Sequence, residues 1–241
     1  LPKEWYGGKV EVKLIDKPIN IKKDILDILD KYLENTLGIY IVGSYARNEQ
    51  TKRSDVDILV ITYKTTKNIK IGKYNLILIT KEKIENALKS NILPILPMLK
   101  EAKSIINGEL IKKYAETSLR KENLKWHIEL TKSALGVNRA AINLDKEWPS
   151  NSDDAVAYSL ILRLRGVYIV DCLRKNKKWN NRELIKIVKK ISGSLRAYEG
   201  YLRVKDNEKS GENLPIKEAE KLYYYVLNKI KEQKRWVKIK K

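Results

Sequence analysis

The pattern of apolar and polar positions changes once along this chain, near residue 115. Before that point short apolar runs alternate with helical patterns, and three of these runs predict buried strands: 38–42, 58–61 and 74–80. After it, apolar residues recur every three, four or seven positions, which is typical of amphipathic helices. We therefore predict an α/β domain with a mixed sheet and flanking helices over residues 1–115, and an all-α helical bundle over residues 116–241.

Further elements are expected near the N-terminus. Val10, Val12 and Leu14 alternate with polar residues and predict a half-exposed strand. Apolar residues at helical spacing predict a helix over residues 21–36, which Gly38 is placed to end as a C-cap.

The rest of the chain has mainly helical patterns. Residues 81–114 predict helix interrupted by Pro94 and Pro97, with an end near Asn107 and Gly108. The second domain is expected to hold helices over residues 118–144, from a cap at Ser152 onward, and over 180–192, 194–205 and 215–235. The first of these carries one apolar stripe, formed by Leu124, Ile128, Leu135 and Ile142.

The composition adds a strong positive charge. Fifty basic against thirty acidic residues give a net charge of +20, which favours polyanionic partners such as RNA. The same lysine-rich chain, with no phenylalanine, is also typical of the charged surface of a thermophile's protein. The basic C-terminal stretch around Trp236 has two interpretations: it binds RNA, or it is a solvated helix end.

Cysteine content and hydropathy limit the compartment. Cys172 is the single cysteine, so the chain cannot form an internal disulfide, which fits a reducing cytosol. No apolar run is long enough for a membrane span. We predict a cytoplasmic protein that does not contact membranes.

The chemistry is concentrated in one stretch, GSYARNEQTKRSDVDILV. Gly43 and Ser44 follow the first predicted strand, and Asp55 and Asp57 open the second. Because strand side chains alternate, both carboxylates project from one face, where their repulsion favours a hard divalent cation such as Mg²⁺. Gly43 permits close approach of a ligand, and the Ser44 hydroxyl can bind a phosphate oxygen. These parts together suit a metal-bound triphosphate.

This arrangement resembles the signature of the DNA polymerase β-like nucleotidyltransferases, and most closely their minimal prokaryotic members. The resemblance implies Mg²⁺ or Mn²⁺ bound by Asp55 and Asp57, which would be catalytic, and an NTP such as ATP bound by Gly43, Ser44 and Arg47. It further implies transfer of a nucleoside monophosphate to a hydroxyl of a small molecule, an RNA end or a protein, with release of pyrophosphate.

One position departs from the family pattern. The family usually has a third carboxylate on a later strand, where this chain has Asn75. An amide can bind a nucleotide or a metal-bound water but cannot act as a general base. A degenerate protein that binds nucleotide or RNA without catalysis is therefore an alternative function, as is an antitoxin-like partner of a HEPN protein.

The second domain is similar to HEPN-like bundles, and the two-domain layout to antibiotic nucleotidyltransferases such as the kanamycin enzyme. That likeness makes Glu122 or Glu129 a candidate base. A homodimer is also left open. Arg120 and His127 have the spacing of a HEPN ribonuclease motif but also of two neighbours on one helix face. Arg163 and Arg165 could either face the cleft and bind phosphate or form surface ion pairs.

Overall fold

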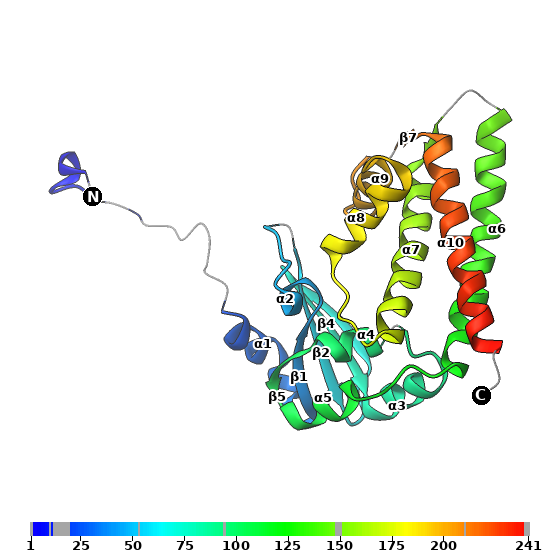
Figure 1. The fold of residues 1–241 in the computed structure, drawn as a ribbon. Coiled ribbons are helices and arrows are strands. Elements are labelled where there is room, and N and C mark those ends of the chain that lie inside the picture. Colours follow the sequence, from blue (N-terminus) through cyan, green and yellow to red (C-terminus); the bar gives the residue numbers. More distant parts are fainter. Residues whose placement is uncertain are drawn as a thin grey trace.

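The computed structural model describes residues 2–9, 11, 20–52, 54–93, 95–147, 151–209 and 211–238. It has a sheet half (residues 20–115) and a helical half (residues 116–238), which lie side by side in Figure 1. This arrangement confirms the predicted fold class. The division into separate domains at residues 115 and 116 stays a prediction. The strand predicted around Val10, Val12 and Leu14 lies outside the described residues.

In the described residues five strands form a mixed sheet. In the order β3-β4-β2-β1-β5 they are β3 (Lys67–Ile71), β4 (Tyr74–Thr80), β2 (Val56–Thr62), β1 (Thr36–Val42) and β5 (Lys103–Ile106). β2 and β4 run parallel, and the other neighbours run antiparallel. The register places Asp57 between Val42 on one side and Asn75 on the other. The C-terminal end of β1 and the N-terminal ends of β2 and β4 therefore lie next to one another at the same end of the sheet.

Alternate side chains of β2 enter two different cores. Val56, Ile58 and Val60 are buried on the face covered by α1 (Ile21–Leu29). Leu59 and Ile61 are buried on the opposite face, which three helices cover: α3 (Lys81–Ser90), α4 (Leu96–Glu101) and α5 (Gly108–Ala115). Asp57 is two residues before Leu59, so its side chain lies on the face of these three helices.

The helical half has one core. Its helices are α6 (Lys125–Glu147), α7 (Asp154–Arg174), α8 (Asn181–Ser192), α9 (Arg196–Lys205) and α10 (Ile216–Lys238), with a two-stranded sheet of β6 (Ser152–Asp153) and β7 (Glu212–Leu214). The bounds of α8, α9 and α10 agree closely with the predicted helices, whereas α6 begins at Lys125 and not at residue 118 as predicted. None of the helices in the described ranges combines the length and the apolarity that a membrane crossing requires.

A buried ion pair stabilises the start of α7. Asp154 is completely buried and accepts hydrogen bonds from Arg203 Nε and Nη2, both at 2.8 Å, and from the Gly211 N–H at 3.0 Å. The hydrogen bonds from Arg203 hold the pKa of Asp154 below its usual value. This pair joins α7 to α9 and to the chain that leads into β7. The predicted cap at Ser152 is wrong, because Asp153 accepts the Ala155 N–H at 2.6 Å instead.

Gly38 does not end a helix, contrary to the prediction. The helix α1 ends at Leu29, a 3-10 turn follows, and Gly38 lies within β1. The reason is the Tyr40 side chain, which folds back over Gly38 so that its hydroxyl donates to the Asn107 carbonyl at 2.9 Å. A Cβ at position 38 would collide with this ring.

The helix predicted over residues 81–114 is also interrupted by a strand. β5 (Lys103–Ile106) pairs with β1 at the sheet edge, a contact that a local pattern cannot specify. Asn107 then begins a helix rather than ending one, since its side chain accepts the Leu110 N–H at 3.2 Å. Pro94 lies outside the described residues, whereas Pro97 is in the first turn of α4.

Candidate active site

The turn after β1 begins with α2 (Gly43–Arg47), a single helical turn whose first residue must be glycine. Gly43 has a φ of +69°, which L side chains rarely adopt. A Cβ at this position would lie 2.5 Å from Asp57 Oδ2. The sequence predicted that Gly43 lets a ligand approach the backbone closely. In this structure the group that lies close to Gly43 is the Asp57 carboxylate.

Asp57 is held between this turn and β4. The Asn75 Nδ2 donates a hydrogen bond to Asp57 Oδ1 at 3.0 Å. Burial raises the pKa of Asp57 above its usual value and repulsion from Asp55 adds to the rise, whereas the Asn75 hydrogen bond lowers it. Asn75 thus orients one carboxylate oxygen and favours the charged form.

Asp55 lies just before β2 and is more open to solvent. Its side chain is 49% exposed, and its Oδ2 is 4.0 Å from Lys70 Nζ. Within the described residues no group of three or more acids, histidines or cysteines is placed to hold a metal. Two carboxylates that repel each other nevertheless fit Mg²⁺, which usually takes one or two protein carboxylates and completes its shell with phosphate and water oxygens.

Arg47 is held by two acids and an indole ring. Its Nε lies 2.8 Å from Glu49 Oε2, its Nη1 lies 2.7 Å from Glu101 Oε2, and its guanidinium carbon is 3.9 Å from the Trp179 ring centroid. Glu101 Oε1 also accepts the Gly43 N–H at 2.7 Å. Burial raises the pKa of Glu101, and the neighbouring Arg47 lowers it. Glu101 therefore links the glycine turn to the arginine.

The Ser44 hydroxyl is free by comparison. Ser44 is half-buried, and within the described part of the chain its side chain makes no hydrogen bond. Its carbonyl accepts the Glu49 N–H at 2.9 Å, which closes the short turn. The hydroxyl is thus available to a bound anion.

The helical half contacts the site directly. The Asn181 N–H, at the start of α8, donates to Glu49 Oε1 at 2.9 Å. Arg165 on α7, for which the sequence left a cleft-facing position and a surface ion pair open, lies 5.0 Å from the centroid of the Trp179 ring. Lys205, at the end of α9, is close enough to Asp57 to lower its pKa.

Sequence reasoning missed Glu49, Glu101 and Trp179. Trp179 and Glu101 lie far from Arg47 in the chain and only the tertiary fold brings them together. Glu49 lies two residues after Arg47, and its charge was the only local signal.

The two acids considered as a base from the helical half lie at exposed positions. Glu122 is in the 3-10 turn before α6, and Glu129 accepts a hydrogen bond from Lys132 at 3.2 Å on the outward side of that helix. Neither acid is among the charged groups that shift the pKa of Asp57.

His127 and Trp236 are packed into the helical half. His127 is buried and its Nε2 lies 3.2 Å from Gln233 Oε1, and burial lowers its pKa to about 4. Arg163, whose Nε is buried without a partner in the described residues, lies close enough to lower the same pKa. Trp236 packs against the core with Arg174 4.8 Å from its ring centroid. These contacts agree with structural roles for both residues.

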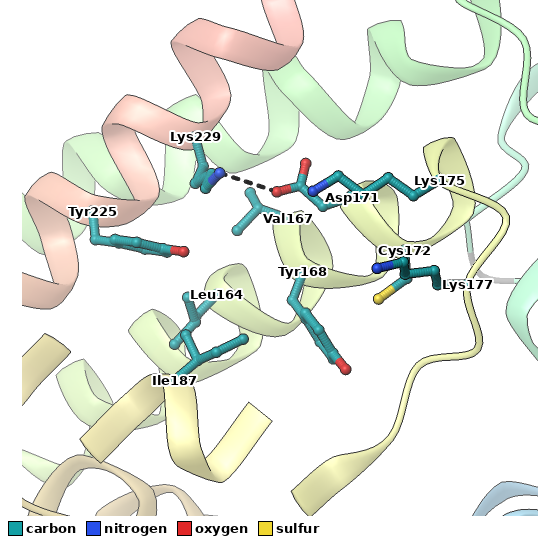
Figure 2. A pocket seen from close by; sticks show the side chains of 10 residues that line it. All are labelled: Leu164, Val167, Tyr168, Asp171, Cys172, Lys175, Lys177, Ile187, Tyr225 and Lys229. Atoms are coloured by element: carbon teal, nitrogen blue, oxygen red, sulfur yellow. Dashed lines mark ion pairs between the residues drawn. The ribbon is translucent and has the colours of Figure 1, made fainter. Parts of the chain in front are cut away.

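A cavity of about 280 Å³ lies in the helical half, between α7, α8 and α10. Figure 2 shows Asp171 and Lys229 next to each other on one side of this cavity, with Tyr168, Tyr225 and Cys172 among the other residues that line it. The Lys229 Nζ is 3.2 Å from Asp171 Oδ2, so these two charges offset each other. None of the residues predicted for the active site lines this cavity.

Comparison with known proteins bears on the same stretch of chain. Residues 22–162 match the family model of a nucleotidyltransferase domain. Two proteins of Methanocaldococcus jannaschii, each named "putative protein adenylyltransferase", are similar to shorter segments. One is 46% identical over 59 residues, which are 22% of this chain and 58% of that protein. The other is 39% identical over 51 residues, which are 21% of this chain and 50% of that protein. The chain thus spans about half the length of the curated relatives it matches.

Two solved structures also match the chain, both distant in sequence. A spectinomycin adenyltransferase from Enterococcus faecialis, solved with ATP and spectinomycin, is 15% identical with a TM-score of 0.45, and the match covers 87% of this chain and 97% of that one. A nucleotidyltransferase-like protein from Exiguobacterium sibiricum is 15% identical with a TM-score of 0.38, over 88% and 75% of the two chains.

Proposed function

Because this chain belongs to the nucleotidyltransferase family, as its resemblance to the DNA polymerase β-like enzymes indicated, we propose that it transfers an adenylyl group from Mg–ATP to a protein hydroxyl. The observation that carries the proposal is the Asp57 carboxylate lying against Gly43, with Ser44 and Asp55 beside it. The choice of a protein acceptor is supported by the names of the two Methanocaldococcus relatives.

The transfer is a single displacement at the α-phosphorus. The acceptor oxygen forms a bond to this phosphorus while the bond to the bridging oxygen of pyrophosphate breaks, and the hydroxyl proton passes to solvent. A divalent cation held by Asp55 and Asp57 would neutralise phosphate charge and make the acceptor hydroxyl more acidic. The Ser44 hydroxyl binds a phosphate oxygen, and Asn75 keeps Asp57 in position.

Arg47 acts from a fixed position in this proposal. The acids Glu49 and Glu101 and the Trp179 ring hold its guanidinium, so its positive charge stays beside the glycine turn as phosphate charge develops. Lys205 adds a second positive charge from the helical half. The acceptor would reach the α-phosphate between the two halves, where Lys205 and Trp179 approach the site.

A second candidate function is nucleotide binding without transfer. Asn75 favours it, because an amide stands where related enzymes have a carboxylate and it donates to Asp57 rather than accepting a proton. In that case ATP would bind at the same turn but no acceptor would be modified.

Labelled ATP separates these functions. The protein is incubated with Mg²⁺, cell extract and ATP that carries the label on its α-phosphate, and the expected result is label on protein. ATP labelled on the γ-phosphate is the control and should label nothing through this reaction. Label on RNA or on a small molecule would show that the acceptor is not a protein. ATP binding without any transfer would support the second candidate.

The pH dependence of transfer should reflect the environment of Asp57. Activity needs the ionised carboxylate, and burial raises its pKa, so the acid limb of kcat/KM at limiting Mg²⁺ should lie above the usual aspartate range. Asn75→Ala removes the hydrogen bond that lowers this pKa and should move the limb to still higher pH. Asn68→Ala, on the exposed edge strand β3, is the control. An unchanged limb in Asn75→Ala would contradict this role of Asn75.

Glu101→Gln tests the link between the turn and Arg47. The amide keeps an oxygen for the Gly43 N–H but removes the charge that pairs with Arg47, so we expect kcat/KM for ATP to fall by roughly tenfold to a hundredfold. The matched control is Glu109→Gln, because Glu109 also pairs with a cation but is 86% exposed. Equal kinetics of the two variants would show that Glu101 does not position the site.

A further inference from the structure

The helix α6 has a second apolar side that the fold does not use. Its outward stripe consists of residues spaced alternately four and three apart: Trp126, Leu130, Ser133, Val137, Ala140 and Leu144. This spacing is the heptad pattern by which one helix packs lengthwise against another. The four large members are strongly exposed, at 59% for Trp126, 48% for Leu130, 70% for Val137 and 58% for Leu144.

The opposite side of α6 already supplies the contacts that the helical half needs. Ile128, Leu135 and Ile142 are buried there in the common core, and α6 packs through them against α7 and α10. In Figure 1 α6 forms an outer edge of the helical half, with α10 beside it. The outward stripe is therefore surplus to the folding of one chain.

The charge pattern of this side differs from the rest of the protein. Between Trp126 and Leu144, which the structure describes throughout, the exposed positions hold one acid, Glu129, and neither lysine nor arginine. Fifty of the 241 residues are basic, so a helix side of this length without an exposed lysine or arginine is unusual. Three basic residues at its border are paired within the same molecule: Lys132 with Glu129, and Arg139 and Lys146 with Glu220, whereas Lys125 is exposed next to Trp126.

These observations favour a second copy of the chain as the partner. Two molecules that each carry a charge of +20 repel one another over most of their surface, and this face lets them approach with little repulsion. An antiparallel pairing of two such helices is also self-complementary in size. It places Trp126 opposite Leu144, Leu130 opposite Ala140, and Ser133 opposite Val137.

We propose that the protein forms a homodimer through antiparallel packing of α6 against α6 of a second copy. The stripe from Trp126 to Leu144 is about 27 Å long at the rise of an α-helix. The small residues Ser133, Gly136 and Ala140 let the two backbones approach closely. A contact of one helix pair is at the small end of specific interfaces, so the dimer is reversible and depends on concentration.

Sedimentation velocity of the whole chain over a range of concentrations tests the dimer. The wild type should pass from monomer to dimer, and Leu130→Glu should weaken the association by at least about a hundredfold, because it places two buried acids on the shared seam. Leu26→Glu is the matched control, since Leu26 is also an exposed leucine on a helix, at 39%. A wild type that is monomeric throughout, or equal effects of the two variants, would overturn the proposal.

A second variant distinguishes loss of the dimer from misfolding, and a cross-link tests the direction in which the two helices pair. Val137→Lys changes a side chain that is 70% exposed, so it should keep the unfolding midpoint and still lose the dimer. For the pairing direction, Ser133→Cys protein is mixed with Val137→Cys protein under mild oxidation, with the native Cys172 buried. The mixture should give more linked dimer than either variant alone. A parallel pair would link each variant to itself instead, and the absence of linkage would contradict the seam.

Discussion

Asp57→Asn is expected to reduce Mg²⁺-dependent transfer by roughly a thousandfold, a loss comparable to removing a main group that stabilises the transition state. The substitution keeps an oxygen for Asn75 but removes the negative charge that would hold the cation. Asp55→Asn should reduce transfer as well, but by less, because Asp55 is the more exposed of the two carboxylates. The measurement is the initial rate of label transfer from α-labelled ATP at saturating Mg²⁺.

The stability of the Asp57→Asn variant shows whether its loss of activity comes from misfolding. Folding raises the pKa of Asp57, so the ionised carboxylate costs the folded state free energy, and this cost appears as pH rises through the interval between the unfolded and folded pKa values. Asp57→Asn removes that cost, and its unfolding midpoint at neutral pH should be no lower than that of the wild type. Asp27→Asn, at an exposed position of α1, should change neither activity nor stability. Full activity of the Asp57 variant would exclude the proposed function.

Asp154→Ala should have the largest effect on stability. The substitution leaves the Arg203 guanidinium and the Gly211 N–H without their buried acceptor, and we expect the free energy of unfolding to fall by about 3 kcal/mol. The measurement is denaturant unfolding at neutral pH. Asp206→Ala, which removes an exposed carboxylate 3.9 Å from Lys205, should stay within about 0.5 kcal/mol of the wild type.

The effect of Asp154 should also depend on pH, with a definite sign. Folding lowers the pKa of Asp154, so its contribution is complete above the usual aspartate pKa and is lost as pH falls through the folded value. The difference between wild type and Asp154→Ala should therefore shrink in acid. A difference that stays constant down to strongly acidic pH would show that the carboxylate charge is not what stabilises this contact.

Local patterns predicted the parts of the fold whose determinants lie close in sequence. The run after Asp57 is apolar on both faces because β2 is covered by helices on both sides, and the strand was predicted from that run. The apolar stripe predicted from Leu124, Ile128, Leu135 and Ile142 is buried in the core of the helical half. The errors fell where a distant residue decides, as with Asn107, which accepts the hydroxyl of the Tyr40 ring above Gly38, and with β5, which pairs with β1.

The sequence alone determined the family, the strand on which Asp57 stands and the turn at Gly43, because strand alternation and the special conformation of glycine act over a few neighbouring residues. Only the tertiary structure decided that Asp57 itself lies against Gly43, that Asn75 donates to it, and that Glu101 and Trp179 hold Arg47. It also decided which of the two apolar sides of α6 is left outside. Burial, and with it the pKa of an acid or the partner of a charge, depends on contacts between segments that only folding brings together.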